Sequence, residues 1–392
     1  MSPIHKAAGT CCLVDLPALR ANLDTVRRIV GADVEILAVV KADAYGHGDI
    51  ETARTLCEEG VRSLGVATVA EGVRLRKAGI EAAILVLGGF APVDAGALVR
   101  HSLNPVVANL DLLRHLDAYG SRHGVEFPCH LKLDTGMGRL GLLSDAIDDW
   151  LPELGGLRAV RLLGVMSHFA GAEEPASPSC RGQLRAFRQA LERIRAAGHP
   201  RAMAHMANSA AIIVLPEARF DMVRPGGMLY GIFSHPPLAE HVRLAPVLTW
   251  QTRVLQLKTL PKDSPVSYGG TFVTRRESVI ATLPVGYADG YKRSLSNRAA
   301  VLVRGRRAPV VGRVTMDLTM ADVTDIGGVQ PGDEVVLLGR QGGETIAAEE
   351  MAGWAETISY EILTSISPKI PRDYIRDREE RETRGQDSKG VD

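Results

Sequence analysis

Short apolar runs alternate with helical patterns from about residue 20 to residue 235. Most segments between the runs place apolar residues at positions i, i+3 and i+4, as in QLRAFRQALERIRAAG. Eight strands that alternate with helices predict a parallel, TIM-like (β/α)8 barrel, whereas the competing open doubly wound sheet usually has fewer strands. The eight runs are EILAVVK, SLGVAT, AAILVLG, NPVVAN, CHLKLD, LLGVMSHF, MAHMAN and FDMVRPG.

The pattern changes after about residue 240, where helical periodicity mostly disappears. Short strand-like runs follow one another there, separated by Gly, Pro and Asp turns, so a β-rich C-terminal domain is expected. These runs are LTWQTRVLQLKTL, ESVIATLPVGYA, AAVLVRGRRAPVVGRV and DEVVLLG, and one helix is expected at AAEEMAGWAET. The final stretch, RDREERETRGQDSKGVD, is highly charged with almost no apolar content, which predicts disorder.

Composition limits the classes of function. The chain has 392 residues, 45% of them hydrophobic, which is enough for two domains with a sizeable core. The formal net charge is zero and no basic stripe is visible, which argues against nucleic acid as a partner. No apolar segment approaches the roughly 18 residues of a membrane span, and the N-terminus lacks the pattern of a secretory signal. The five dispersed cysteines indicate reduced thiols in the cytoplasm and show no metal-binding spacing.

A lysine follows the first predicted barrel strand. The run ILAVV ends on Lys41 and then breaks into the polar turn ADAYGHG. Catalytic groups of such barrels sit where a strand ends and the next loop begins, and partial burial there lowers the pKa of a lysine. A neutral amine can form a Schiff base with an aldehyde or act as a base. The alternative is a lysine that simply reaches water.

The loops after the seventh and eighth predicted strands have the features of a phosphate site. Asn208 and Ser209 offer polar groups beside a helix start, and Gly226 and Gly227 allow a ligand close to the backbone. Barrels of this kind usually bind phosphate in these loops, although Ser209 alone would indicate a helix N-cap. A phosphate site opposite an activated lysine indicates pyridoxal phosphate (PLP), because its aldehyde needs the lysine and its phosphate needs the cradle.

The chain resembles the alanine racemase family in an ordered set of motifs. These are AVVKADAYGHG, LKLDTGMGRLG, MSHFAGAEE, HMANSAA, VRPGGMLYG, VSYGGTF, LPVGYADGY, GRVTMDLTM and ETISYEI, within residues 11 to 375. The resemblance implies a homodimer whose active sites combine the barrel of one chain with the β domain of the partner. It divides the chain into an N-terminal strand that packs with the C-terminal domain (1–16), the PLP-binding barrel (17–240), the β-rich domain (241–375) and a charged tail (376–392).

The resemblance also implies two bases on opposite faces of PLP, because racemisation removes the α-proton from one face and returns one to the other. Lys41, which holds PLP as a Schiff base, matches one base, and Tyr268 of the partner matches the other. A tyrosine with a pKa near 10 needs cationic or hydrogen-bonding help, and His168 and Arg224 match the residues that provide it. Arg224 also matches the residue facing the pyridine nitrogen, where an arginine keeps that nitrogen unprotonated and limits side reactions.

The other matched residues surround the cofactor and the substrate. Arg139 matches the arginine that contacts the PLP phenolic oxygen and the substrate carboxylate, and Lys132 matches a position that is often a carbamylated lysine holding that arginine. Thr315 stands where many members have cysteine, which puts substrate breadth in question. The further matches are Tyr45, Asn208, Ser209, Gly226, Gly227 and Tyr360 around the phosphate, Met316 for the substrate carboxylate, and Tyr287, Tyr360 and Asp317 along the access channel.

Other functions fit the sequence less well. GMGRLG also satisfies the dinucleotide-binding fingerprint of nicotinamide dehydrogenases. However, it follows the fifth strand and not the first, and no clear acidic residue stands at a strand end about 20 residues later. A PLP decarboxylase usually has a cysteine motif in its C-terminal domain, whereas all five cysteines lie before residue 181. A metal-assisted aldolase or dehydratase needs a metal cluster there, and His241 is the last histidine. A non-catalytic PLP carrier lacks the β domain.

The sequence therefore predicts a cytoplasmic amino-acid racemase that interconverts L- and D-alanine and supplies D-alanine for peptidoglycan. Its expected partners are a small amino-acid substrate and a second copy of the chain, with no metal, nucleic acid or membrane. Serine, or a broader set of amino acids, would use the same catalytic residues. Broad-specificity relatives are typically exported, so the missing signal sequence weighs against that class.

Overall fold

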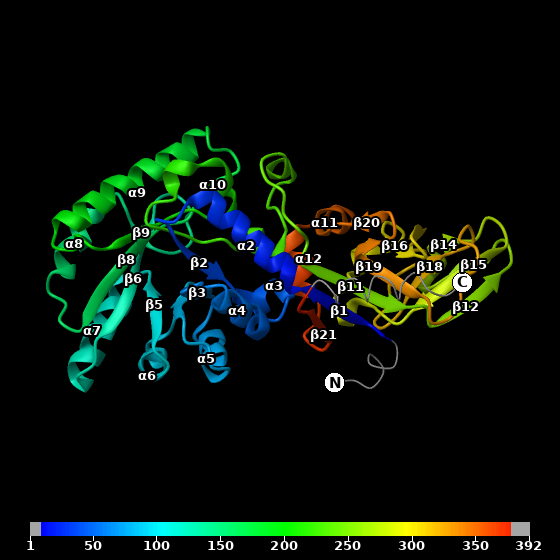
Figure 1. The fold of residues 1–392 in the computed structure, drawn as a ribbon, viewed down its shortest axis with the longest axis horizontal. Coiled ribbons are helices and arrows are strands. Elements are labelled where there is room, and N and C mark those ends of the chain that lie inside the picture. The colour runs from blue at the N-terminus through cyan, green and yellow to red at the C-terminus, as the bar shows by residue number, and fades with distance from the viewer. Residues whose placement is uncertain (1–8, 378–392) are drawn as a thin grey trace.

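The computed structural model describes residues 9–377, which form two lobes (Figure 1). The barrel lobe occupies the left of Figure 1 and the β-rich lobe the right, with the strand β1 and the helix α12 near their junction. The expectation of a (β/α)8 barrel followed by a β-rich domain is confirmed. Within the described residues, no helix combines the length and apolar character needed to cross a membrane.

Eight parallel strands close the barrel. Their order is β5-β4-β3-β2-β10-β9-β8-β6, and a further pairing of β5 with β6 closes the ring, which the open doubly wound alternative would lack. All eight predicted runs contribute a strand. The strands are β2 (Glu35–Val39), β3 (Ser63–Val66), β4 (Ala83–Val86), β5 (Leu103–Val107), β6 (Phe127–Asp134), β8 (Val160–Met166), β9 (Met203–His205) and β10 (Met222–Val223), with the short β7 (Leu142–Leu143) paired to β6.

Helices cover the outside of the barrel because each has one apolar face. In α9, the predicted QLRAFRQALERIRAAG helix, the buried residues Leu184, Phe187, Leu191 and Ile194 recur at helical spacing. Ser177 caps its first turn by accepting a hydrogen bond from the Cys180 N–H. The helices are α2 (Leu16–Val30), α4 (Asp49–Glu58), α5 (Val69–Lys77), α6 (Ala95–Arg100), α7 (Leu110–His123), α8 (Ile147–Leu154), α9 (Pro178–Ala196) and α10 (Ser209–Val214).

The C-terminal lobe is built on a seven-stranded sheet with the order β17-β16-β19-β11-β1-β21 and β20 paired to β19. The N-terminal strand β1 lies inside this sheet, antiparallel to β11 and parallel to β21. Smaller sheets are formed by β12-β15-β18 and β13-β14. The strands are β1 (Cys11–Asp15), β11 (Leu248–Arg253), β12 (Gln256–Leu260), β13 (Pro265–Val266), β14 (Phe272–Val273), β15 (Ser278–Leu283), β16 (Ala300–Val303), β17 (Arg306–Pro309), β18 (Thr319–Asp322), β19 (Glu334–Gln341), β20 (Glu344–Ile346) and β21 (Arg372–Ile375).

The prediction of one helix in this lobe was incomplete. The expected helix is α11 (Ala348–Ala355), and a second, α12 (Ser359–Ser365), follows it after the left-handed residue Glu356. The short α12 has too few turns for a helical period to stand out in the sequence. The predicted disorder of the charged tail falls mostly on residues 378–392, which lie outside the described residues.

Candidate functional site

Charged and polar residues gather at one mouth of the barrel. Parallel strands end at the same rim, so residues that follow different strands become neighbours there. Lys41 follows β2, Arg139 and His168 follow β6 and β8, and Arg224 follows β10. The predicted site residues that belong to this rim are Lys41, Tyr45, Lys132, Arg139, His168, Asn208, Ser209, Arg224, Gly226 and Gly227.

Lys41 begins the segment α3 (Lys41–Gly46). The residue is exposed to solvent at the rim, but surrounding protein atoms still exclude part of the water from the amine. This burial lowers the pKa of Lys41, the Arg139 guanidinium lowers it further, and the Glu71 carboxylate opposes them. The lysine is therefore easier to deprotonate than a free one, as a nucleophile or base requires.

The turn after Lys41 has an unusual backbone. Four consecutive residues, Ala42 to Tyr45, lie in the left-handed region, with φ between 52° and 55°. None is glycine, and this conformation costs roughly 1–2 kcal/mol per residue. The turn buries Ala44 completely and carries Tyr45 into contact with Tyr230, at a ring separation of 4.9 Å. Neighbouring groups must therefore hold the turn in shape.

The residues predicted to contact a phosphate group, which are Tyr45, Ser209, Gly226, Gly227 and Tyr360, lie together in a cluster that is called the cradle below. A Cβ added at Gly226 would lie 2.4 Å from the Tyr45 hydroxyl oxygen, and one at Gly227 would lie 2.6 Å from that of Tyr360. Both glycines are buried, and the Ser209 Oγ accepts hydrogen bonds from the N–H groups of Gly226 (3.0 Å) and Met228 (3.3 Å). With both acceptor positions used, the Ser209 O–H remains a donor for an anion.

The tyrosines of the cradle stay protonated. Burial raises the pKa of Tyr45 above its ordinary value and that of Tyr360 to about 12, so both hydroxyls can donate hydrogen bonds to phosphate. Asn208 has a different role in the chain itself. Its side-chain oxygen caps α10 by accepting from the Ala211 N–H at 3.0 Å, so the N-cap is Asn208 and not Ser209.

Arg224 is buried among hydrogen-bond acceptors rather than carboxylates. Its Nη2 donates to the carbonyls of Ser167 (2.7 Å) and Met206 (3.0 Å) and to the His168 Nδ1 (3.2 Å). Its Nη1 donates to the His205 Nδ1 at 3.3 Å. Burial lowers the pKa of Arg224 to about 9, which leaves the guanidinium charged at neutral pH.

These contacts determine the tautomers of the histidines. An arginine only donates, so the Nδ1 atoms of His168 and His205 must accept, and their protons lie on Nε2. The Nε2–H of His205 then donates to the His130 Nδ1 at 2.9 Å. Burial lowers the pKa of His130 to about 4, and burial with the nearby Arg224 charge holds the pKa of His168 well below its usual range. All three imidazoles are neutral at pH 7.

Sequence reasoning did not single out His130 and His205, although both are buried beside or behind Arg224. A signal was available, since each histidine stands between apolar residues of a buried strand, in CHLKLD and MAHMAN. Gly164 of β8 provides space for His130. A Cβ there would lie 2.4 Å from the His130 Nδ1.

Lys132 and Arg139 lie at the same rim. Lys132 is nearly buried, and burial together with the charges of Arg139, Arg224 and Lys41 lowers its pKa to about 8. Arg139 is exposed to the open mouth, in a loop held by Asp134. The Asp134 carboxylate accepts from the N–H groups of residues 136, 137 and 138 through Oδ1 and from Arg139 N–H through Oδ2, at 2.9–3.1 Å.

The variant Asp134→Asn is expected to unfold with a free energy lower by about 1–3 kcal/mol, because its amide NH2 cannot accept from the Arg139 N–H. Burial raises the pKa of Asp134, but the four N–H groups outweigh it, so the folded-state pKa is lowered. The carboxylate therefore stabilises the fold above about pH 4, and this contribution is lost as the pH falls through the lower folded value.

Thermal unfolding at pH 7 and at pH 3 measures this effect. The gap between wild type and Asp134→Asn should narrow at the lower pH, and the KM for substrate should rise as the Arg139 loop loosens. Asp145→Asn, at an exposed carboxylate of the same connecting segment, is the matched control. Equal melting temperatures for wild type and Asp134→Asn at pH 7 would contradict the prediction.

Four predicted site residues lie in the C-terminal lobe and not at the barrel mouth. Tyr268 starts η5 (Tyr268–Gly270), Tyr287 starts η6 (Tyr287–Asp289), and Met316 and Asp317 lie between β17 and β18. The side chains are open to solvent, with exposed fractions of 72% for Tyr268, 54% for Met316 and 44% for Tyr287. In Figure 1, β14 and β18, which follow these residues in the chain, lie in the right-hand lobe, away from the barrel strands. Tyr360 differs, because α12 brings it to the cradle.

Thr315 closes the loop that contains Met316. Its Oγ1 donates to the Leu318 carbonyl at 2.8 Å and accepts from the Leu318 N–H at 3.1 Å. The Tyr287 N–H donates to the Thr315 carbonyl at 3.0 Å, which joins this loop to η6. The hydroxyl that replaces the more common cysteine therefore shapes the loop.

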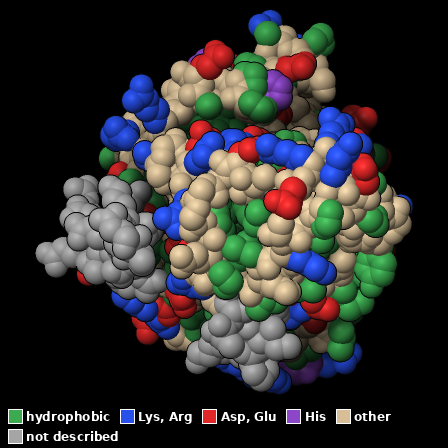
Figure 2. Space-filling view, turned by 90° about the vertical axis from the view of Figure 1, so that its right-hand side faces the viewer, with side chains coloured by type: hydrophobic (Ala, Val, Ile, Leu, Met, Phe, Trp, Pro, Cys, Tyr) green, Lys and Arg blue, Asp and Glu red, His purple; other side chains and the backbone are tan. Residues whose placement is uncertain are grey.

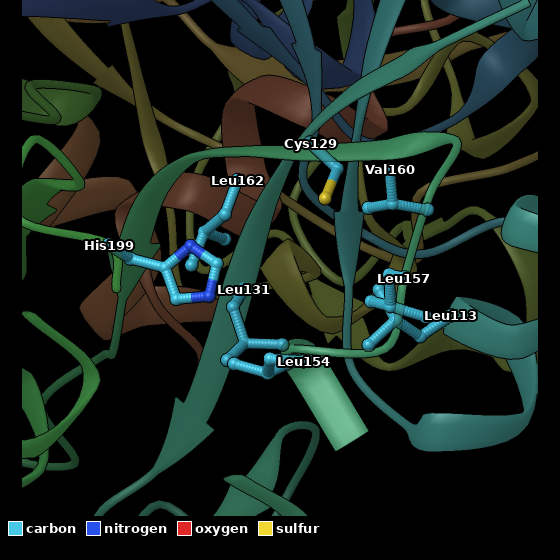
Figure 3. Close-up of a pocket in the computed structure, with 8 residues that line it drawn as sticks. All are labelled: Leu113, Cys129, Leu131, Leu154, Leu157, Val160, Leu162 and His199. Atoms are coloured by element: carbon cyan, nitrogen blue, oxygen red, sulfur yellow. The ribbon is translucent and has the colours of Figure 1, made fainter. Parts of the chain in front are cut away.

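A small cavity lies behind the barrel wall (Figure 3). It is lined by Cys129 and Leu131, which alternate along β6 with His130 and Lys132, by apolar residues of α7, α8, β8 and the α8–β8 loop, and by His199. Its volume is about 10 Å³, close to that of one water molecule. The lining is apolar apart from His199, and a single imidazole does not make a site for a charged ligand, so this cavity is a packing defect on the face of β6 opposite the site.

Comparisons with known proteins cover both lobes. The family model for the alanine racemase N-terminal domain matches residues 14–234, and that for the alanine racemase C-terminal domain matches residues 247–374. An alanine racemase of Symbiobacterium thermophilum is 50% identical over 361 residues, which are 92% of this chain and 96% of that one. An alanine racemase of Halothermothrix orenii is 45% identical over 361 residues, 92% of this chain and 95% of that one.

Solved structures agree with the sequence comparisons. The alanine racemase of Bacillus anthracis with bound L-Ala-P has a TM-score of 0.89 and 36% identity, covering 94% of this chain and 95% of that chain. The alanine racemase of Bartonella henselae with covalently bound pyridoxal phosphate has a TM-score of 0.85 and 32% identity, covering 93% of this chain and 98% of that chain. The resemblance seen in the sequence is thus confirmed, and the chain belongs to the alanine racemase family.

Proposed function

We propose that this protein is an alanine racemase that interconverts L- and D-alanine. One observation carries the proposal: Lys41, Arg224 and the cradle at Gly226 and Gly227 converge at the mouth of one barrel. The near relatives named alanine racemase share most of the chain and support the same assignment. A cytoplasmic location and a role in supplying D-alanine for peptidoglycan remain predictions from the family, as do the domain boundaries.

The residues present fit PLP. The cradle offers glycine backbone that a Cβ would fill and three hydroxyl donors, from Tyr45, Ser209 and Tyr360, which suits a phosphate dianion. Lys41 would hold the aldehyde carbon, and Arg224 would face the ring nitrogen as a donor that does not release its proton. When bound, PLP supplies a conjugated ring that withdraws electrons from the substrate α-carbon and makes its proton acidic.

Lys41 would move the α-proton on one face and the partner's Tyr268 on the other. Support for the second base comes from His168. Its Nδ1 accepts from Arg224, so its Nε2–H is left to donate to a phenolate oxygen that approaches from outside the barrel. Such a donor, beside the Arg224 charge, would stabilise the deprotonated tyrosine.

The substrate carboxylate would be held by Arg139 of one chain and by the backbone N–H of Met316 of the other. Arg139 stands in the open mouth at the end of a loop fixed by Asp134, and Met316 stands exposed in a loop fixed by Thr315. Tyr287 and Asp317 flank the second loop and would narrow the access channel together with Tyr360. A narrow channel favours a small side chain such as that of alanine.

A homodimer with composite sites is part of the proposal. Tyr268, Tyr287 and Met316 are large side chains exposed in the C-terminal lobe, and Leu318 beside them is 37% exposed. Figure 2 looks at the outer end of this lobe and shows hydrophobic side chains gathered near its centre, between Lys, Arg, Asp and Glu side chains. A gathering of exposed hydrophobic side chains rimmed by charged ones suits a contact with a partner chain.

Proton exchange in D2O tests the function. Holoenzyme is given L-alanine and L-serine separately, and deuterium incorporation and D-isomer formation are followed. We expect deuterated D-alanine from the wild type and a slower reaction with serine. Deuterium incorporation without formation of the D-isomer would mean that a base acts on only one face of the substrate. No deuterium incorporation with either amino acid would refute the racemase assignment.

We also propose that Lys132 is carbamylated. Its pKa of about 8 leaves roughly a tenth of the amine neutral at pH 7, the form that adds CO2. The resulting anion would attract Arg139, whereas the unmodified cation repels it. Labelled bicarbonate should give a carbamate signal in the 13C NMR spectrum of wild type that is missing from Lys132→Met, and equal spectra would refute the modification.

A further inference from the structure

We propose that Glu71 and Arg372 are positioning residues for Lys41, because they clamp the left-handed turn that follows it from two sides. The inference rests on the proposed function in one respect, namely that Lys41 and Tyr45 of this turn hold the cofactor. Both act by fixing the backbone between residues 42 and 48, and the Glu71 carboxylate also acts on Lys41 through its charge.

The turn needs such a clamp. Four left-handed residues in succession store several kcal/mol of strain, which persists only if the surroundings over-determine the backbone. Within the turn, the His47 Nδ1–H donates to the carbonyls of Ala44 and Tyr45 at 2.9 and 3.0 Å. Asp43 accepts from the Asp49 N–H and pairs with Arg74, whose side chain is half exposed. The contacts of Glu71 and Arg372 fix the two ends of the turn.

Glu71 holds the start of the turn from α5. Its Oε1 accepts from the Ala42 N–H at 2.8 Å, directly after the lysine, and its Oε2 accepts from the N–H groups of Ala67 (2.6 Å) and Thr68 (3.3 Å). The carboxylate thus ties the β2 end to the β3 end of the barrel rim. All three partners are donors, so only a group with two accepting oxygens satisfies them.

Arg372 holds the end of the turn from the C-terminal lobe. Its Nε donates to the Gly46 carbonyl at 3.0 Å, while its other nitrogens donate to the carbonyls of Ser367, Ile370 and Ile366 at 2.6–3.1 Å. The strand β21 that begins with Arg372 is thereby bound to the segment that carries Lys41.

The backbone of the turn is pressed directly against the same lobe. A Cβ at Gly46 would lie 2.3 Å from the Leu363 carbonyl of α12, and one at Gly48 would lie 1.9 Å from the Tyr374 hydroxyl. The C-terminal lobe therefore acts on its own chain's lysine, in addition to the tyrosine that it would present to the partner.

Glu71→Gln tests the first side of the clamp. Its amide has one accepting oxygen, and its NH2 would face the N–H of Ala42 or of Ala67 and Thr68. We expect PLP to bind about tenfold or more weakly to the apoprotein. In the apoprotein, hydrogen exchange at the amides of Ala44, His47 and Gly48 should also be faster. Glu126→Gln, at an exposed carboxylate paired with Arg161, is the control.

Arg372→Lys and Gly46→Ala test the second side. The lysine keeps the charge but cannot donate to four carbonyls, and the alanine pushes the turn away from α12 without changing the C-terminal segment. Both variants should show the same increase in amide hydrogen exchange at residues 44–48 and the same loss of PLP affinity as Glu71→Gln. In both, kcat should fall by a larger factor than KM rises. Arg376→Lys, next to the same strand, should behave as wild type.

Wild-type exchange at residues 44–48 together with wild-type PLP affinity in folded Glu71→Gln and Arg372→Lys would overturn the inference. A lower melting temperature with unchanged hydrogen exchange at the turn would also overturn the inference, because the two residues would then contribute only to general stability. Neither readout depends on racemisation. If the wild type binds PLP but does not racemise alanine, the proposed function is refuted, whereas hydrogen exchange and PLP affinity still test the roles of Glu71 and Arg372.

Discussion

An equimolar mixture of Lys41→Ala and Tyr268→Phe chains, allowed to exchange subunits, is expected to recover about one quarter of wild-type racemase activity. Each variant alone should be slower than wild type by about 10²–10⁴-fold, since each lacks one of the two proposed bases. In a mixed dimer, one site combines Lys41 of the Tyr268→Phe chain with Tyr268 of the Lys41→Ala chain, and the other site has neither residue. Half of randomly formed dimers are mixed, and half of their sites are intact.

The location of Tyr268 explains why this result is expected. The side chain is 72% exposed and lies in the C-terminal lobe, whereas Lys41 lies at the barrel mouth. The control mixes wild type with the double variant Lys41→Ala/Tyr268→Phe. Composite sites predict about one quarter of the activity of an equal amount of wild type, and sites within one chain predict about one half. Failure of the two single variants to complement, with mixed dimers verified by mass spectrometry, would contradict the shared site.

Arg224→Lys is expected to lower kcat by roughly 10²-fold and to reduce the free energy of unfolding by about 2–4 kcal/mol. A lysine keeps the charge but cannot reach the two carbonyls and two imidazoles that the guanidinium serves. The Nδ1 of His168 would lose the donor that fixes its tautomer. Its Nε2–H would then no longer be directed toward an incoming tyrosine.

The measurement combines thermal unfolding with steady-state kinetics on the folded fraction. His130→Asn is a milder variant of the same network, because it touches His205 and not the guanidinium. Its kcat should stay closer to wild type. The explanation fails if Arg224→Lys has near-wild-type kcat, or if His130→Asn is as impaired as Arg224→Lys at equal stability.

Much of the barrel could be predicted because each strand is a separate apolar run bounded by turn residues. Every predicted run contains a barrel strand, and the rule that parallel strands end at one rim was enough to direct attention to Lys41 and Ser209. The position of β1 in the C-terminal sheet came from the family resemblance and not from periodicity. Pairing between strands so far apart in the sequence leaves no periodic pattern in either strand from which it could be predicted.

The shape of the turn after Lys41 could not be predicted. The residues Ala42 to Tyr45 include no glycine, and only Asp43 is of a type that often adopts a left-handed backbone, so local preferences argue against four such residues in a row. The conformation is imposed by distant partners, among them Arg372, which is 326 residues from the Gly46 carbonyl that it binds. The helix α12 was missed for a related reason, because its few buried residues show no period.

The strand β1 has a consequence for how the protein is made. Cys12 lies between Trp250 of β11 and Arg372 of β21, so β1 must wait for β21, which is synthesised about 360 residues later, before their sheet is complete. At about 5–20 residues per second, that wait lasts on the order of tens of seconds. All barrel strands are synthesised during this time, while one edge of the second lobe stays unpaired. Deletion of β1 would therefore remove an interior strand from the sheet of the lobe that is synthesised last.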